Sequence, residues 1–179
     1  MTACPPPGSC ASIRPMVTKR RSHEEGHRRK FLVVVDDTPE CDRAVVYASR
    51  RAARTGGGVV LLFIIDDSDF RGFLGVEQAM RAEAREAAEM TLAKVGERVK
   101  AIAGIEPDQV IREGTRSAEI LAAIEADEDI AILALAAGTG SEGPGPLVTS
   151  IAGRASGTFP VPITIVPGHL GDDEIAAMA

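Results

Sequence analysis

Five short runs, each followed by a segment long enough for a helix, constrain the fold of this 179-residue chain more than any other feature. The expected strands, most of them rich in Val, Ile and Leu, cover residues 31–35, 59–65, 109–112, 130–135 and 161–166. Uninterrupted aliphatic strands are typical of parallel sheets that helices cover on both faces. The alternation therefore predicts one doubly wound α/β domain over residues 31–168, with a five-stranded parallel sheet.

Helical signals occupy the segments between these strands. Thr38 is expected to cap the first helix, with Pro39 at its first position and Arg54 near its end. A long helix is expected over 76–102, where apolar residues such as Ala87, Thr91 and Val95 recur at steps of three and four. Shorter helices are expected over 117–126 and 147–156.

The two ends of the chain show no such periodicity. Residues 1–30 hold seven Lys or Arg against two Glu, and we expect a disordered basic tail, within which Met16 offers an alternative start. Residues 169–179 are expected to form a C-terminal tail. The remainder of the chain is acidic, which argues against nucleic acid as the main partner because phosphate binding needs clustered basic residues.

Cysteine content and apolar runs suggest the cellular compartment. The three cysteines, Cys4, Cys10 and Cys41, form no CxxC motif and no even set for disulfides, so a reducing, cytoplasmic setting is expected. The apolar run from Val59 to Ile65 is far shorter than the roughly 18 to 20 residues of a membrane span. We therefore expect neither a membrane segment nor a secretory signal.

The carboxyl ends of the first and fourth strands mark the expected ligand site, because ligands of such sheets bind where the strand order reverses. Asp36 follows the first strand and would accept a hydrogen bond from a ribose hydroxyl, or serve only as a turn carboxylate. The glycine-rich segment 138–146 follows the fourth strand and leads to Thr149 and Ser150. If these begin a helix, its dipole would favour an anion such as phosphate. The alternative is a surface loop whose glycines merely permit tight turns.

Other motifs in the chain give no catalytic or metal site. The string GxGxxG at Gly138 is not a dinucleotide fingerprint, because Pro144-Gly145-Pro146 separates its last glycine from any helix. No GxxxxGK[ST] motif is present, and no nucleophile is paired with a base. The acidic run that starts at Asp66 is better explained as a turn than as a cation site.

Four segments together resemble the universal stress proteins over residues 31–168. They are VVVDDTPECDRAVVYA, REGTRSAEILAAIE, DIAILALAAG and TSIAGRASGTFPVPITIVP. The resemblance implies a Rossmann-like or flavodoxin-like fold of the adenine nucleotide alpha hydrolase type. It also implies a homodimer formed by pairing of the last strand, from Val161 to Val166.

The same resemblance implies a site for ATP or another adenine nucleotide, with Mg²⁺ as a companion ion. The residues it assigns to that site are Asp36, Thr38, Ile65, Ala137, Gly138, Gly140, Thr149 and Ser150. The family's phosphate loop, G-x2-G-x9-G-[ST], is altered here, and Glu142 adds negative charge. If its closing pair falls on Thr149-Ser150, then Ala136, Thr139 and Thr149 stand where glycines are expected. If the loop is shifted by two residues, Gly138 matches, but the loop length changes.

Three functions therefore stay open after this reading. The first is a non-catalytic protein that binds a nucleotide and signals in a stress response. The second is a member of the family that binds no ATP. The third is an enzyme that hydrolyses or transfers nucleotide phosphates, which the missing catalytic set disfavours.

Overall fold

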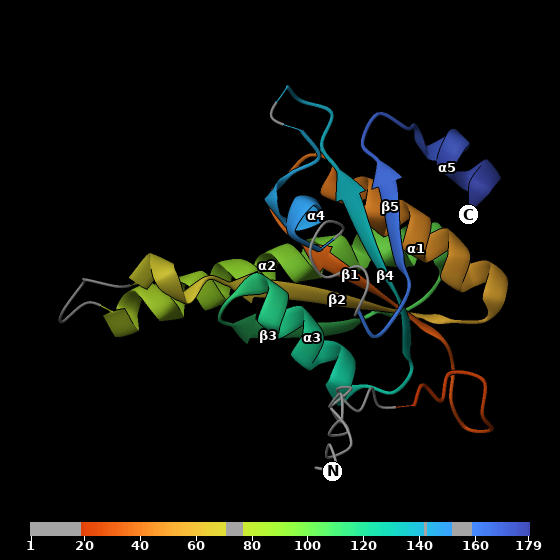
Figure 1. Cartoon of the computed structure of the whole chain (residues 1–179), viewed down its shortest axis with the longest axis horizontal. Coiled ribbons are helices and arrows are strands. Elements are labelled where there is room, and N and C mark those ends of the chain that lie inside the picture. Colours follow the sequence, from red (N-terminus) through yellow and green to blue (C-terminus); the bar gives the residue numbers. More distant parts are fainter. Residues whose placement is uncertain (1–18, 71–76, 142, 152–158) are drawn as a thin grey trace, which may run out of the picture.

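A computed structural model of the chain describes residues 19–70, 77–141, 143–151 and 159–179 (Figure 1). The strands are β1 (Lys30–Val35), β2 (Gly58–Ile65), β3 (Asp108–Glu113), β4 (Ile130–Ala137) and β5 (Ile163–Pro167). The α-helices are α1 (Cys41–Thr55), α2 (Glu77–Ala103), α3 (Arg116–Ala126), α4 (Pro146–Ser150) and α5 (Asp172–Met178), and a 3₁₀ turn, η1, spans Asp67–Phe70.

The five strands form one parallel sheet in the order β3-β2-β1-β4-β5. This confirms the predicted fold class. The order is that of the Rossmann type rather than that of flavodoxin, and it reverses between β1 and β4. The carboxyl ends of these two central strands therefore lie beside each other, with a crevice between the segments that follow them.

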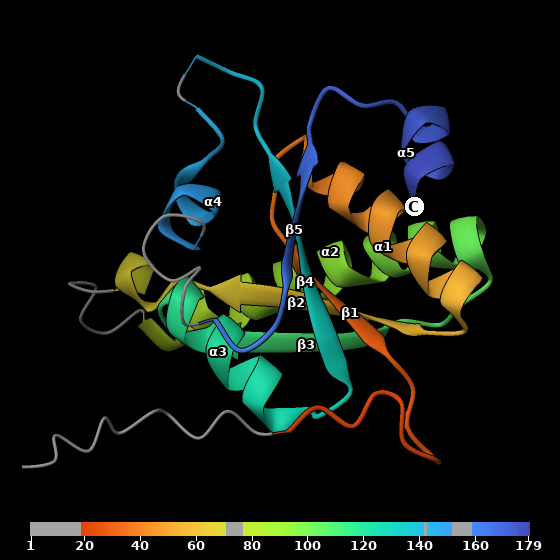
Figure 2. The ribbon, with the colours of Figure 1, turned by 45° about the vertical axis from the view of Figure 1, so that its right-hand side comes forward.

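Helices cover both faces of the sheet, as the two ribbon views show (Figures 1 and 2). On one face, Leu32, Leu62 and Leu133 pack with α3 and α4. On the other, Phe31 and Leu61 pack with α1 and α2. Neighbouring residues of β1 and β2 are thus buried on opposite faces, which explains why these strands are aliphatic without interruption.

Two helices differ from their predicted form. Helix α1 begins at Cys41 and not at Pro39, because the Thr38 hydroxyl donates to Asp36 instead of accepting from a helical N–H. In α2 the buried line runs through Ala88, Leu92 and Gly96, while Ala87 is exposed. The predicted stripe is therefore correct at Val99, which is buried, and at Val95, which packs against the core, but it is one position early at Ala87 and Thr91. Ala is common on both sides of this helix, so it does not mark the inward face.

The described part of the expected basic tail, residues 19–29, is held against the α3–β4 corner. The Arg20 guanidinium donates to the Ile124 carbonyl at 2.5 Å, and His27 Nδ1 lies 2.7 Å from Asp129 Oδ1. Ser22 is buried. The prediction of disorder is therefore wrong for this part, because its basic side chains meet carbonyl and carboxylate groups. Residues 1–18, with Cys4, Cys10 and Met16, lie outside the described residues.

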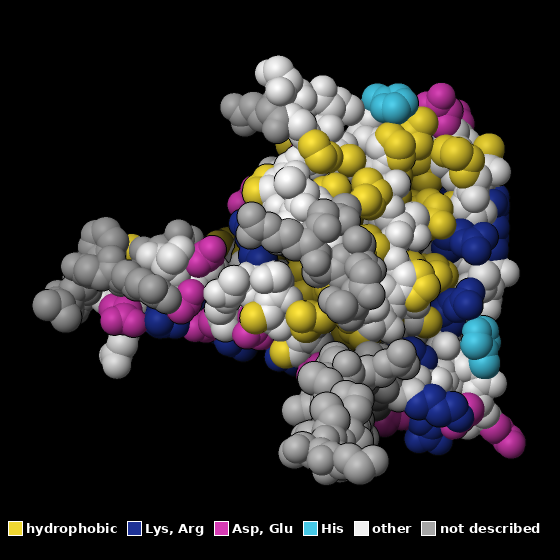
Figure 3. Space-filling model, in the orientation of Figure 1, with side chains coloured by type: hydrophobic (Ala, Val, Ile, Leu, Met, Phe, Trp, Pro, Cys, Tyr) yellow, Lys and Arg dark blue, Asp and Glu magenta, His cyan; other side chains and the backbone are white. Residues whose placement is uncertain are grey.

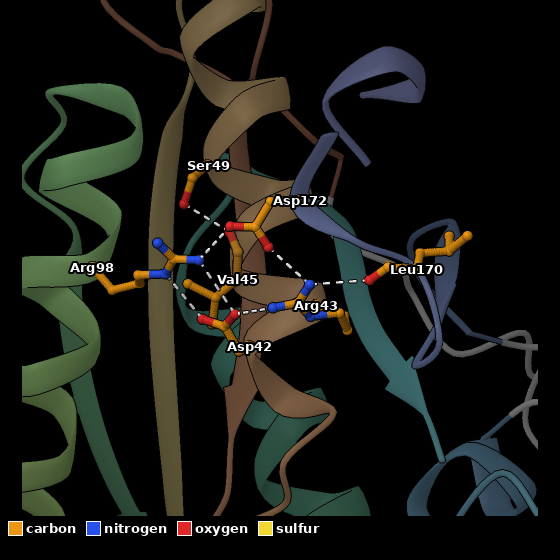
Figure 4. Close-up of polar contacts among 7 residues, drawn as sticks. All are labelled: Asp42, Arg43, Val45, Ser49, Arg98, Leu170 and Asp172. Carbon is orange, nitrogen blue, oxygen red and sulfur yellow. Dashed lines mark hydrogen bonds and ion pairs between the residues drawn. The ribbon is translucent and has the colours of Figure 1, made fainter. Parts of the chain in front are cut away.

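The predicted C-terminal tail contains a helix, α5, that packs on α1 (Figures 1 and 2). Ile175 is fully buried with Val46 and Val166. Asp172 accepts from Arg43 at 2.8 Å and from Arg98 of α2 at 2.7 Å, as Figure 4 shows. The Arg98 hydrogen bond, with Arg43 beside it, lowers the pKa of the Asp172 carboxyl. The folded unit thus extends beyond the predicted limit at residue 168.

Among the helices that the structure describes, none is both long enough and apolar enough to cross a membrane.

Candidate functional site

Three adjoining cavities lie at the carboxyl ends of the strands, at the point where the strand order reverses. Their volumes are about 120, 180 and 430 Å³. The first two share Val34, Asp36 and Thr38, and Arg116 lines all three. We call these three cavities the crevice. Its position is the one that the sequence predicted for the ligand.

Asp36 is the acidic group that the crevice receives from β1. Its Oδ1 accepts hydrogen bonds from the Thr38 backbone N–H at 3.1 Å and from the Thr38 hydroxyl at 2.6 Å. This turn fixes the carboxylate, while Oδ2 accepts no hydrogen bond from the described residues. A half-buried, oriented carboxylate with one oxygen unused is suited to accept from a sugar hydroxyl.

The loop after β4 is folded onto itself. The Gly138 N–H donates to the Pro144 carbonyl at 3.3 Å, and the Gly143 N–H donates to the Gly140 carbonyl at 3.1 Å. Neither Gly138 nor Gly140 lines the three cavities. Glu142 lies outside the described residues. Two backbone donors of the expected phosphate loop are thus engaged within the loop.

The sequence predicted Thr149 and Ser150 at the start of a helix. In the structure they lie at its end. Helix α4 begins at Pro146, and Thr149 is already hydrogen-bonded to Gly145 through both its N–H and its hydroxyl, at 3.0 and 2.8 Å. Pro146 can start the helix because its missing N–H would have no partner there. Ser150 lines the largest cavity of the crevice. The end of the predicted helix, residues 152–156, lies outside the described residues.

The remaining residues implied by the family resemblance take part in the sheet. Ile65 is buried toward α2 with Ala88, and its carbonyl accepts from the Gly114 N–H at 3.0 Å. The neighbouring residue, Ile64, lines the crevice instead. The Ala137 carbonyl accepts from the Gly168 N–H at 2.9 Å. Asp36, Thr38 and Ser150 are therefore the predicted residues that the structure brings together in the crevice.

Arg116 is a crevice residue that the sequence reasoning missed. It is the first residue of α3, and it is the only basic side chain among the described residues that line the crevice. The hydroxyls of Thr115, Ser117 and Ser150 line the same cavity. The signal was present, since Gly114-Thr115-Arg116 directly follows β3 and so must lie at the same edge of the sheet.

The largest cavity, of about 580 Å³, lies on the other face, between α1 and α2. Its charged lining includes Lys94 and Arg98 opposite Asp37 and Asp42, and Arg98 is paired with Asp42 at 3.1 Å. Cys41 also lines it, but burial raises the pKa of this thiol to about 11, so the thiol stays neutral. Size alone does not make this the ligand site. It shares Asp36 and Thr38 with the crevice, but none of its lining residues comes from β4, α3 or α4, so it extends away from the gap between β1 and β4 where the strand order reverses.

The described residues contain no group of three or more His, Cys, Asp or Glu side chains that could hold a metal ion. The described crevice residues supply hydrogen-bond acceptors, such as Asp36, and one cation, Arg116. The Cys41 thiol is buried and neutral, so it is not an activated nucleophile. Fold and site define an α/β protein of the Rossmann type, with a crevice where the strand order reverses. The universal stress protein family model matches residues 27–167, and the chain belongs to this family.

Solved structures are similar in fold over most of the chain. UspA from Lactobacillus plantarum is 16% identical with a TM-score of 0.65, covering 77% of this chain and 97% of its own. A universal stress protein in complex with cAMP is 13% identical with a TM-score of 0.57, covering 78% and 97%. One from Archaeoglobus fulgidus in complex with dAMP is 15% identical with a TM-score of 0.53, covering 77% and 97%. No match is found among curated proteins.

Proposed function

We propose that the protein is a non-catalytic universal stress protein that binds an adenine nucleotide, ATP or another, in the crevice and signals in a stress response. The observation that carries the proposal is Asp36, whose oriented carboxylate keeps Oδ2 free beside Arg116 and an apolar lining. Ribose hydroxyls would donate to Asp36, and phosphate oxygens would accept from Arg116. A companion Mg²⁺ would be held by the phosphates.

Two further facts support this proposal. Membership of the family places the chain among proteins of the same fold. Two structural neighbours are complexes with the adenine nucleotides cAMP and dAMP. The Val34 and Leu135 side chains give the crevice an apolar wall, which a purine base can cover.

The test uses purified protein and two variants. We expect the supernatant of heat-denatured protein to contain an adenine nucleotide on ion-exchange chromatography, and millimolar nucleotide to raise the melting temperature. Asp36→Ala should lose both signals, whereas Asp173→Ala, which removes an exposed carboxylate of α5, should keep them. Wild-type protein without co-purified nucleotide and without a thermal shift would contradict the proposal.

The enzymatic alternative makes a different prediction. An enzyme that hydrolyses or transfers nucleotide phosphates would turn over labelled ATP faster than its own Asp36→Ala variant. We expect equal, background rates for the two proteins, because no group in the crevice is arranged to activate water. Turnover that depends on Asp36 would replace the non-catalytic proposal by the enzymatic one.

We also propose that the protein is a homodimer formed through β5. This strand is at the edge of the sheet, so its outer N–H and C=O groups can pair with a second copy. Ile165 is 40% exposed, and Figure 3 shows hydrophobic side chains on the face that β5 crosses. Light scattering at micromolar concentration should give a dimeric mass. Ile165→Lys should give a monomer, whereas Met90→Lys, at an exposed position of α2, should leave the dimer intact. A monomeric wild type would contradict the proposal.

A cytoplasmic location completes the proposal. It is supported by the odd number of cysteines and by Cys41, which is a free, buried thiol.

A further inference from the structure

The charges of the crevice are distributed unevenly between its two sides. On the side of the β4 loop, two donors that the family resemblance assigns to a phosphate chain are engaged. Gly138 N–H is bonded to Pro144, and the Thr149 hydroxyl is bonded to Gly145. Pro146, the first residue of α4, has no N–H to offer. Gly138, Thr149 and Pro146 therefore supply no free donor to an anion on this side.

Glu40 adds a negative charge to the same side. A Cβ atom on Gly138 would lie 2.9 Å from Glu40 Oε1, and one on Gly168 would lie 3.2 Å from Glu40 Cβ. The side chain is thus packed between the start of the β4 loop and the end of β5. It is half-buried, lines the crevice with Asp36, and makes no hydrogen bond or ion pair with the described residues. Its carboxylate thus adds a negative charge, without an ion pair to the described residues, beside the start of the β4 loop.

Arg116 supplies the opposite charge on the α3 side. Its exposed guanidinium makes no ion pair with the described residues, and the residue lines each of the three cavities. The hydroxyls of Thr115 and Ser117 line the largest cavity of the crevice with it. A guanidinium holds a phosphate by two parallel hydrogen bonds, so one phosphate can be bound here without the β4 loop.

We infer that Arg116 and Glu40 together restrict the crevice to an adenine nucleotide with a single phosphate. The inference rests on the proposed function and specifies its ligand. The phosphate of a mononucleotide is paired with Arg116. The second and third phosphates of ATP extend toward the β4 loop, where they meet Glu40 and find the loop donors engaged.

The test is calorimetric titration of the full chain with adenosine, AMP and ATP. Wild type should bind AMP at least about tenfold more tightly than ATP, the scale of one charge contact at a partly exposed site. Arg116→Gln should weaken the binding of AMP about tenfold and leave the affinity for adenosine unchanged. Lys94→Gln, which removes a cation from the cavity on the other face, should change neither.

The Glu40 variant tests the other half of the inference. Glu40→Gln keeps the shape of the side chain and removes its charge. The affinity for ATP should therefore rise about tenfold relative to the affinity for AMP. Glu125→Gln, an exposed carboxylate of α3, should leave the ratio unchanged. Equal urea midpoints will show that each variant is folded.

The possible failures can be told apart. If adenosine, AMP and ATP all fail to bind, the proposed function itself is overturned. If adenosine binds but ATP is bound as tightly as AMP by wild type, or the Glu40→Gln ratio does not move, only the inference is overturned. An Arg116→Gln protein that binds AMP as wild type does would overturn it as well.

Discussion

Gly168 joins the end of β5 to the β4 loop, and replacing it tests how tightly this junction is packed. A Cβ at this position would lie 2.5 Å from the backbone oxygen of Ala137, which cannot move away as a side-chain tip can. The Gly168 N–H also donates to that oxygen at 2.9 Å. Gly168→Ala therefore forces the two strand ends apart. Forced overpacking costs about 1–3 kcal/mol, and a weakened hydrogen bond adds about 0.5–1.5 kcal/mol.

Gly171 provides the matched control. A Cβ there would meet nothing closer than Glu174 Oε2 at 3.6 Å. Both substitutions reduce the freedom of the unfolded chain, which is worth about 0.4–1 kcal/mol. We therefore expect Gly168→Ala to lower the free energy of unfolding by about 1–3 kcal/mol. Gly171→Ala should leave it nearly unchanged, because the reduced freedom of the unfolded chain offsets the loss of a glycine at the N-cap of α5. Urea denaturation followed by circular dichroism measures both, and equal midpoints for the two variants would refute the reasoning.

Two further properties can be checked directly. Because burial raises the pKa of the Cys41 thiol to about 11, iodoacetamide at pH 8 should label Cys41 slowly in native protein and rapidly in urea; rapid native labelling, read by peptide mass, would contradict this. The pKa of Asp172 is lowered by Arg98 and Arg43, so its contribution to stability is present above the ordinary carboxyl pKa and is lost as the pH falls through the lowered value. Asp172→Asn should thus lower the free energy of unfolding by up to about 1 kcal/mol at pH 7 and leave it unchanged at acid pH, as measured by urea denaturation across the pH range. A difference that does not depend on pH would argue against the ion pairs of Asp172 with Arg98 and Arg43.

The sheet could be predicted because its signal is local. The run from Val59 to Ile65 is apolar throughout and rich in β-branched Val and Ile, and it becomes β2 almost residue for residue. The same holds for β1 and β4, whose aliphatic side chains are buried on both faces. Once the strands alternate with helices, the place of the crevice follows from the topology. Its place was therefore available from the sequence.

The details of the site depend on contacts between distant residues, which no local pattern reports. Thr38 is a residue type that often caps helices, yet its hydroxyl donates to Asp36, and helix α1 starts only at Cys41. Glu40 meets Gly138 and Gly168 only because three strand ends converge. Helix α5 did carry a signal in the sequence, because Glu174 stands three residues after Gly171, the spacing of a capping box. In the structure the Glu174 carboxylate accepts from the Gly171 N–H at 2.8 Å. It was missed because the family pattern ends before it.

The central claim is that a nucleotide binds in the crevice and not in the larger cavity between α1 and α2. Hydrogen–deuterium exchange with and without millimolar AMP tests this directly. We predict slower exchange at the start of α3, around Arg116, which lines the crevice and not the larger cavity. Asp36 and Thr38 line both, so protection there does not distinguish the two sites. Amides from Thr91 to Arg98, beside the larger cavity, should exchange as before. Protection confined to Thr91–Arg98 would contradict the account.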